Sequence, residues 1–441
     1  MGDVAPAETA DPTAPMRTRE YRSLIVLAGL LGVVTSVVAW GFLELAFHVQ
    51  GWVFDDLPDA LGYGSAPVWW PLPILAIAGV IVAIVIDRLP GEGGHVPAFG
   101  LNPSPTHPIQ LPGVILAGVA TIGLGLVLGP EAPLMALGGG LGLLAIQLVR
   151  PGAPDEAAQV VAAASTLAAL AFLFGSPIVA ALILIEAAGL GGSRLPIVLV
   201  PGLFAAAIGS LMWIGMGAWT GLNTSAISIS ALKLPSFPRP DIADFGWTIL
   251  LSVAIAVVTF AIFQIAKRTH RLTLPRPLVL LPVLGLAVAG LAILFSQVAD
   301  KDVSYALFSG ENSLDALVEN PGSWSLWVLA LLIGCKGLAY AFSLGGFRGG
   351  PVFPALFLGA AGGMMAAHLP GFSLTPAVAV GLGASVTSVL RLPLSGAALG
   401  VFLTIPAGAG SSPLIIVGVV IAYLTTLALS AKLGDAPAAA H

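Results

Sequence analysis

The chain has 441 residues, of which 57% are hydrophobic and 9% are charged, and its net charge is −5. Soluble globular domains carry about 25% charged residues, so the composition excludes a soluble domain and predicts an integral membrane protein. The negative balance argues against a nucleic-acid partner. The single cysteine, Cys335, excludes a disulfide or a multi-cysteine metal site within one subunit, and no cofactor is expected.

The predicted elements begin after a polar, proline-rich stretch. Residues 1–22 are expected to form a disordered cytoplasmic tail, because they lack the basic region and short apolar core of a signal peptide. Apolar runs then predict a first membrane repeat over 23–217 and a second over 244–431. The polar stretch 218–243 is expected to link the repeats, and 432–441 to form a short C-terminal tail.

Helices are expected where an apolar run lies between glycine or proline breaks. Several of these runs are shorter than the roughly 20 residues of a full span, which predicts broken or tilted helices in an all-α protein. The helices expected in the first half cover 23–48, 70–87, 111–128, 131–149, 157–174, 177–190 and 195–215. Those expected in the second half cover 246–266, 277–296, 304–318, 325–343, 352–368, 374–389, 392–405 and 413–431.

The two halves repeat a spacing of proline and glycine that indicates an internal duplication. The same offsets separate the members of two triplets, which are Pro133, Gly138, Gly142 and Pro354, Gly359, Gly363. Basic residues precede the first span and fill the loop 267–276, and the positive-inside rule places both regions in the cytoplasm. The halves then have opposite topologies, which predicts an inverted repeat. Chance recurrence in a chain with 54 glycines and 35 prolines is the alternative.

Three breaks in the helical pattern carry the chemistry, and they cover residues 93–97, 129–133 and 349–354. Helix N-termini offer unpaired N–H groups and about half a unit of positive charge, which stabilise an anion without a fixed cation that would trap it. Glycine lets the backbone approach a ligand, and proline suits the first turn of a helix. Because inverted-repeat transporters bind their cargo where broken helices meet, the breaks predict an anion site near the bilayer midplane.

These breaks read GGHVP, GPEAP and GGPVFP. They resemble the G-S-G-I-P, G-R/K-E-G-P and G-G-I/V-F-x-P motifs of the CLC family of chloride channels and anion/proton exchangers, in the same order and at similar separations. The resemblance covers roughly residues 23–431. It implies a multi-pass protein of the cell membrane, a homodimer with one pore per subunit, and a transporter of small monovalent anions, with chloride favoured, rather than an enzyme. No cystathionine-synthase-type regulatory domain is expected in the short tail.

Glu131 is the residue that we expect to act as the gate. It is the only acid between Glu92 and Asp155, and it opens a helix at a Gly-Pro break. An intramembrane carboxylate is costly and is functional by default, whereas the alternative is a helix-start acid that only complements the dipole. The resemblance implies that its carboxylate occupies an anion site and swings away when it is protonated or displaced. The anion-binding residues that the motifs imply are Gly93, Gly94, His95, Val96, Gly129, Ala132, Gly349, Gly350, Val352 and Phe353.

The chain departs from the family pattern at four places. Gly94 stands where the family has a selectivity serine, which leaves the preferred anion open, and the adjacent His95 either donates to the anion or caps a turn as a neutral histidine. Pro130 replaces a basic residue before the gate. Ala187 stands where exchangers usually carry a second acid for proton transfer. The family's pore tyrosine comes from a final helix, and Tyr423 is not an obvious substitute.

Several alternatives stay open. Within transport, the rivals are a proton-coupled anion antiporter and a transporter of another halide. An intramembrane hydrolase using Ser176 is the remote rival, although that serine lacks a Gly-x-Ser-x-Gly context. Lys336 is either functional or paired with a nearby acid or carbonyl, and Arg348 either attracts anions or snorkels to an interface.

Overall fold

The computed structural model describes residues 14–192, 194–220 and 231–433, and the regular structure in these ranges is helical. Most of the two expected tails and part of the expected linker lie outside the described residues. The helices of the first half are α1 (Arg19–Gly51), α2 (Leu57–Ala60), α3 (Pro71–Arg88), α4 (Leu111–Gly123), α5 (Glu131–Val149), α6 (Asp155–Phe174), α7 (Pro177–Ala187) and α8 (Arg194–Thr220). Those of the second half are α9 (Ile242–Thr273), α10 (Pro277–Ala299), α11 (Glu311–Glu319), α12 (Leu326–Gly346), α13 (Val352–Ala366), α14 (Leu374–Leu390), α15 (Pro393–Thr404) and α16 (Ser412–Lys432).

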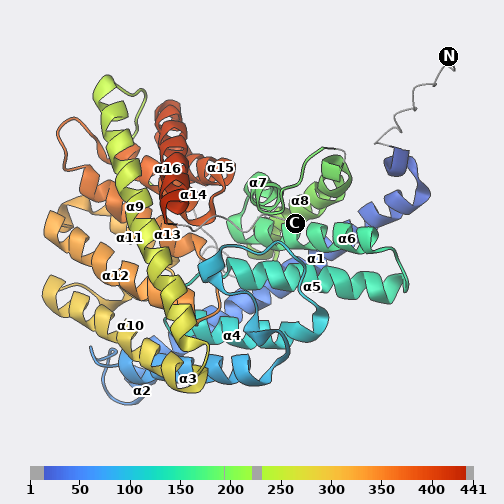
Figure 1. Ribbon diagram of the computed structural model, residues 1–441, viewed down its shortest axis with the longest axis horizontal. Helices are drawn as coiled ribbons and strands as arrows, with labels where there is room; N and C mark the ends of the chain where they lie inside the picture. The colour runs from blue at the N-terminus through green and yellow to red at the C-terminus, as the bar shows by residue number, and fades with distance from the viewer. Residues whose placement is uncertain (1–13, 193, 221–230, 434–441) are drawn as a thin grey trace.

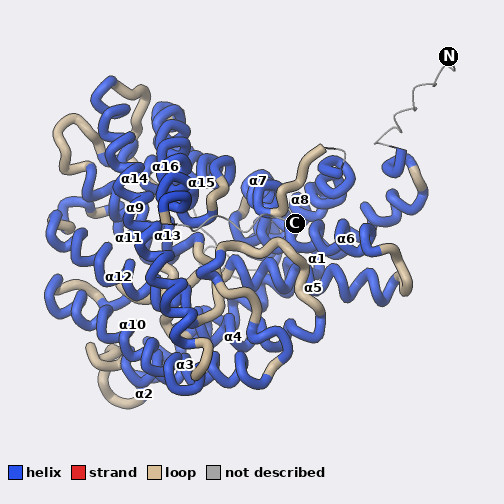
Figure 2. The backbone as a smooth tube through the Cα atoms, viewed as in Figure 1, coloured by secondary structure: helices blue, strands red, loops and turns tan. Residues whose placement is uncertain are grey.

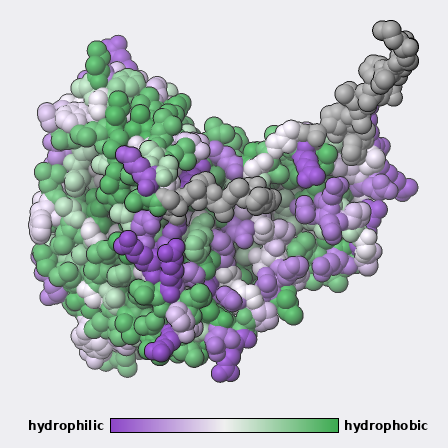
Figure 3. All heavy atoms as spheres, in the orientation of Figure 1, coloured by the Kyte–Doolittle hydropathy of each residue, from purple (hydrophilic) through white to green (hydrophobic). Residues whose placement is uncertain are grey.

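The helices have the lengths and the apolar surface of a multi-pass membrane protein. Within the described ranges, nine helical stretches are long and apolar enough to cross a bilayer. Shorter apolar helices accompany them, as the broken pattern of the sequence predicts: Pro108–Gly123, Pro177–Ala187, Val352–Ala366, Leu374–Leu390 and Pro393–Ala407. Hydrophobic residues spread over much of the face seen in Figure 3, while hydrophilic residues lie near its middle and over its right-hand part.

The two halves of the chain form two groups of helices that meet in the interior. In Figure 1, α1 and α5 to α8 gather on one side, and α9 to α16 gather on the other. The groups are also joined at the edge, where α3 of the first half packs against α10 of the second. The tube in Figure 2 shows loops between the groups. The residues at the starts of α5 and α13, Glu131 and Val352, are buried in the protein interior.

Local signals set where many helices begin. The side chains of Ser176 and Ser325 accept the N–H groups of Val179 and Val328, which caps α7 and α12. Asp241 and Asp244 form a capping box at the start of α9. Proline is the first residue of α3, α7, α10 and α15, where its missing N–H costs no helical hydrogen bond.

One expected helix, 304–318, is shorter than predicted. The Asp302 side chain accepts the Ser304 N–H and starts a single 3-10 turn over Val303–Tyr305. Phe308 and Gly310 then adopt positive φ angles of 56° and 89°, which an α-helix cannot contain. Helix α11 therefore starts only at residue 311, and the segment before it is a tight turn in the protein interior.

The paired glycines predicted from the repeat allow two close helix contacts. A Cβ added to Gly142 of α5 would lie 2.6 Å from the Cα of Ala162 in α6, and one added to Gly363 of α13 would lie 2.6 Å from the Cα of Val378 in α14. Such close approaches leave no room for a side chain. The glycines at matching offsets thus have matching packing roles, while the inverted topology of the halves stays a prediction.

Candidate functional site

Two of the three predicted breaks meet in the interior, at the starts of α5 and α13. The Gly129 N–H donates to the Gly350 carbonyl oxygen at 2.8 Å, and the Gly350 N–H donates back to the Gly129 carbonyl. This reciprocal pair joins residues from the two halves of the chain. It sets the free N–H groups of two helix N-termini side by side, which is the arrangement that stabilises an anion.

The Glu131 side chain lies between these two helix N-termini. Glu131 is the first residue of α5 and is 1% exposed. Its Oε1 accepts the Phe353 N–H at 2.8 Å, so the carboxylate reaches the N-terminus of α13 as well as that of its own helix. Its Oε2 is buried and has no hydrogen-bond partner among the described residues. The interpretation of Glu131 as an acid that only complements the dipole of its own helix does not describe this geometry.

Gly129 and Gly350 form a cradle around the carboxylate of Glu131. A Cβ on Gly350 would overlap Glu131 Oε2 and would lie 2.9 Å from the Glu131 backbone nitrogen. A Cβ on Gly129 would lie 2.8 Å from the carboxyl carbon. Real Cβ atoms do not approach this closely, so both positions require glycine for the side chain of Glu131 to remain where it is.

The third predicted break meets the other two at a cavity of about 170 Å³. The predicted site residues in its wall come from all three breaks, and they are Gly93, Gly94, His95, Ala132 and Gly349. Arg348 also lines the cavity, and its Nε donates to the Glu92 carbonyl oxygen at 3.0 Å, which ties the first break to the third. Val96 lies instead among partly buried apolar residues next to the core, outside the cavity wall.

His95 is held in a neutral form at this cavity. Burial lowers the pKa of His95, the positive charge of Arg348 lowers it further, and a backbone contact with Gly100 acts in the opposite direction. A neutral imidazole has one donor and one acceptor nitrogen. Its Nε2 is buried with no partner among the described residues, so His95 does not use both ring nitrogens to cap its turn.

The adjacent Gly94 has a φ of 103°, which L side chains rarely adopt. A serine at this position would be strained whatever space surrounded it. The hydroxyl of the family pattern therefore has no simple equivalent here, because the backbone at position 94 follows a path suited to glycine.

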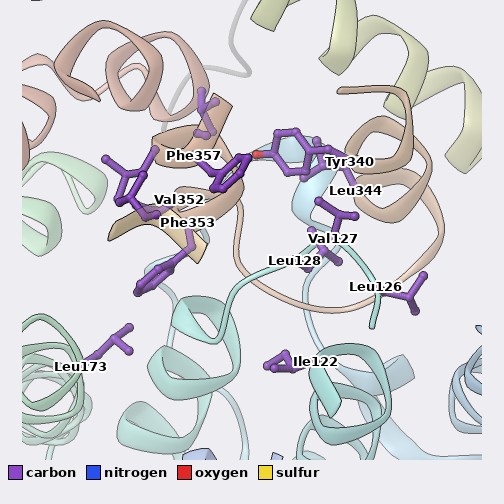
Figure 4. Packing of buried hydrophobic residues seen from close by; sticks show 14 of the residues in the cluster. Ile122, Leu126, Val127, Leu128, Leu173, Tyr340, Leu344, Val352, Phe353 and Phe357 are labelled. Carbon is purple, nitrogen blue, oxygen red and sulfur yellow. The ribbon is translucent and has the colours of Figure 1, made fainter. Parts of the chain in front are cut away.

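Aromatic side chains support the start of α13. The Phe353 ring stacks on Phe174 from the end of α6, with ring centroids 5.9 Å apart and an angle of 6° between the planes. The Tyr340 hydroxyl donates to the Pro351 carbonyl oxygen at 2.6 Å. Figure 4 shows this hydroxyl directed at the first turn of the helix that carries Val352 and Phe353. Both of those side chains are buried, and the N–H groups of this turn are held in place from two sides.

Lys336 and Arg348, whose roles the sequence leaves open, are both buried. Lys336 donates to the carbonyl oxygens of Tyr305, Leu307 and Phe308 at 3.0, 2.7 and 3.2 Å, which confirms the pairing with carbonyls. The alternative that Arg348 snorkels is wrong, because the residue is 4% exposed and its guanidinium donates to two carbonyls. Arg348 remains able to attract anions to the cavity.

Other candidate residues have structural partners. Ser176, the serine of the hydrolase alternative, accepts the Val179 N–H as the cap of α7. The Glu186 carboxylate accepts the N–H groups of Leu394 and Ser395 at 2.8 and 2.6 Å, so it caps α15. Among the described residues, no group of three or more histidine, cysteine or acidic side chains could hold a metal ion.

Sequence reasoning missed several polar residues around the site. Four of them line the cavity and come from the proline-rich stretch after the first break: Asn102, Ser104, Thr106 and Gln110. Their clustering in an otherwise apolar chain was the available signal. A fifth, Glu311, is a buried acid whose sequence neighbourhood gives no sign of its surroundings.

Comparisons with known proteins place this geometry in context. Residues 98–427 match the protein family described as Voltage gated chloride channel. A putative ion-transport protein, YfeO, of Escherichia fergusonii is 31% identical over 364 residues, which cover 80% of this chain and 81% of the relative. The YfeO protein of an Escherichia coli strain is 30% identical with the same coverage.

Solved structures share the fold at lower identity. A slow cyanobacterial Cl−/H+ antiporter aligns with a TM-score of 0.73 and 18% identity, over 93% of this chain and 95% of that one. A CLC-type fluoride/proton antiporter aligns with a TM-score of 0.69 and 18% identity, over 92% and 95% of the two chains.

Proposed function

Because this chain belongs to the CLC family, whose members are anion transporters and channels and not enzymes, we propose that it carries small monovalent anions past Glu131 acting as a gate. Chloride is the favoured cargo. The observation that carries the proposal is the hydrogen bond from the Phe353 N–H to Glu131 Oε1, because a carboxylate then occupies the place of a transported anion.

The gate works by competition for one set of donors. An ionised Glu131 carboxylate holds the N–H group at the start of α13 and fills the space between Gly129 and Gly350. Protonation removes its charge and weakens its hold on that N–H, so an anion can take its place. An arriving anion can also displace the carboxylate directly, because both are stabilised by the same helix N-terminus.

The cavity beside the gate is the proposed waiting position for the anion. Backbone groups of the first and third breaks and the buried Arg348 make it electropositive, and polar side chains of residues 102–110 line it. Buried positive charge attracts anions over longer distances than an exposed charge can, because less water screens it. Neutral His95 supplies a further polar group without adding a charge that would trap the anion.

Proton-coupled exchange is the second candidate, and two observations favour it. The two antiporters with the same fold carry chloride or fluoride against protons. Glu131 is also a buried carboxyl with an unpartnered oxygen, which is able to hold a proton. Uncoupled conduction is favoured instead by Ala187, where exchangers usually have a second acid. A homodimer with one pore per subunit and an inverted repeat belong to the same proposal.

Anion efflux from proteoliposomes, with and without a protonophore, tests the proposal. Efflux of chloride that depends on pH in the wild-type protein and loses that dependence in Glu131→Gln supports the gate. Unchanged flux and pH response in Glu131→Gln would refute it. A protonophore that accelerates efflux identifies exchange with protons, whereas efflux that needs only a potassium shunt identifies a channel.

A further inference from the structure

Glu311 is a second buried acid near the proposed gate. It is the first residue of α11, and both of its carboxylate oxygens are shielded from solvent even though the residue as a whole is partly exposed. Neither oxygen has a hydrogen-bond partner, and no cation among the described residues lies within ion-pair distance. Burying an ionised carboxylate without partners is costly, so these surroundings favour the protonated form of this side chain.

The turn before Glu311 is fixed against the segment that leads to Glu131. The Phe308 N–H donates to the Gly125 carbonyl oxygen at 3.1 Å, and a Cβ added to Gly125 would lie 3.5 Å from the Phe308 ring. Gly310 packs against the Phe357 ring of α13, and a Cβ on it would lie 2.6 Å from that ring. Lys336 holds the same turn through its three carbonyl contacts. The carboxyl of Glu311 is therefore positioned by several contacts and is not placed there by a flexible loop.

Glu131 is the main charged neighbour of Glu311, because the other titratable groups nearby have partners of their own. Burial raises the pKa of Glu311 well above its ordinary value, and the negative charge of Glu131 raises it further. On α12, Lys336 is bound to carbonyls and the Tyr340 hydroxyl donates to the Pro351 carbonyl. Helix α13 has no titratable side chain, and Asp315 of α11 has an interaction of its own.

We propose that Glu311 is a second proton-binding site coupled to the gate, so that the carboxyl groups of Glu311 and Glu131 titrate as one unit. Two carboxylates in a shared low-dielectric region do not both ionise readily, and the pair carries one proton where two isolated acids would carry none. The inference rests on the proposed function, since it assigns Glu311 the role of setting the pH at which Glu131 releases its site.

The pH dependence of chloride efflux tests this coupling. In Glu311→Gln the second negative charge is absent, so the midpoint of the efflux profile should move to lower pH by about one unit or more, a tenfold change in proton concentration. Glu319→Gln, an exposed acid on the same helix, is the matched control and should keep the wild-type midpoint. Glu311→Asp retains a carboxyl and should keep a pH response close to that of the wild type.

The outcomes separate this inference from the function on which it rests. If Glu131→Gln abolishes the pH dependence while Glu311→Gln and Glu319→Gln share the wild-type midpoint, the coupling is wrong and the gate survives. If Glu131→Gln keeps the wild-type profile, the gate itself is wrong.

Infrared spectroscopy gives a second readout that needs no flux. The carbonyl stretch of a protonated carboxylic acid should persist at neutral pH in Glu131→Gln and should be lost on adding Glu311→Gln. Should the double variant not fold, the band of Glu131→Gln alone decides, because its absence at neutral pH would overturn the proposal.

Discussion

Gly350→Ala is the substitution that the site geometry predicts most sharply. The added methyl group would overlap Glu131 Oε2 and crowd the Glu131 backbone nitrogen at 2.9 Å. The cradle is closed on its other side by Gly129, so the carboxylate cannot move sideways within it. We therefore expect Gly350→Ala to expel the carboxylate of Glu131 and to leave the Phe353 N–H open to anions.

The size of the effect follows from the contact that is lost. A hydrogen bond to a charged group contributes about 1.5–3 kcal/mol, which corresponds to roughly a 10- to 150-fold change in the occupancy ratio of the carboxylate. Chloride efflux at neutral pH should rise toward the rate that the wild-type protein reaches in acid, and it should become nearly independent of pH. The extra methyl also costs about 1–3 kcal/mol of overpacking, which lowers thermal stability.

Efflux from proteoliposomes over a range of pH measures this change. Gly362→Ala in α13, the helix that follows Gly350, is the control, because a Cβ there would meet only Ile255 at 3.8 Å. Combining Gly350→Ala with Glu131→Ala should change efflux no further than Glu131→Ala alone, since both remove the same carboxylate. A Gly350→Ala protein that folds and keeps the wild-type pH dependence would refute the cradle.

Three further substitutions test other parts of the structure. Burial lowers the pKa of His95 below its ordinary value of 6.5. The contribution of neutral His95 to the free energy of unfolding is therefore complete above pH 6.5 and declines as the pH falls below it. Between about pH 7.5 and 5.5 the wild-type melting temperature in detergent should thus fall more than that of His95→Gln, with exposed His107→Gln as control. Glu186→Gln weakens the cap of α15 and should cost about 1–3 kcal/mol, seen as a lower melting temperature and contradicted by an unchanged one. Lys336→Met leaves one buried and two partly buried carbonyls without their donor, at about 1–3 kcal/mol for the buried one, so a melting temperature equal to that of the wild type would contradict this role.

The sequence predicts the site where its signal is local. A Gly-Pro break before an apolar run marks a helix start in any context, so the starts of α5 and α13 and the acid at the first of them could be read directly. The glycine triplets could also be read, because glycine at helical spacing indicates close packing. In the structure, Gly142 packs closely against α6 and Gly363 packs closely against α14.

Features that depend on the three-dimensional arrangement could not be predicted from the sequence. Glu131 and Glu311 are far apart along the chain, and only the fold brings the turn before α11 against the segment leading to α5. The late start of the helix expected over 304–318 depends on a positive φ at Phe308, a residue type that gives no such signal. The long side chain of Arg348 made snorkelling one open interpretation, and the Glu92 carbonyl that helps to keep it buried comes from a distant turn.

The central claim is that an anion and the Glu131 carboxylate compete for the N–H groups at the start of α13. Bromide bound to crystals of Glu131→Ala, located by its anomalous scattering, tests this competition most directly. A bromide peak within hydrogen-bond distance of the Phe353 nitrogen, absent from wild-type crystals in the same salt, is the predicted result. Bromide that occupies the same positions in both proteins, none of them at the Phe353 nitrogen, would contradict it.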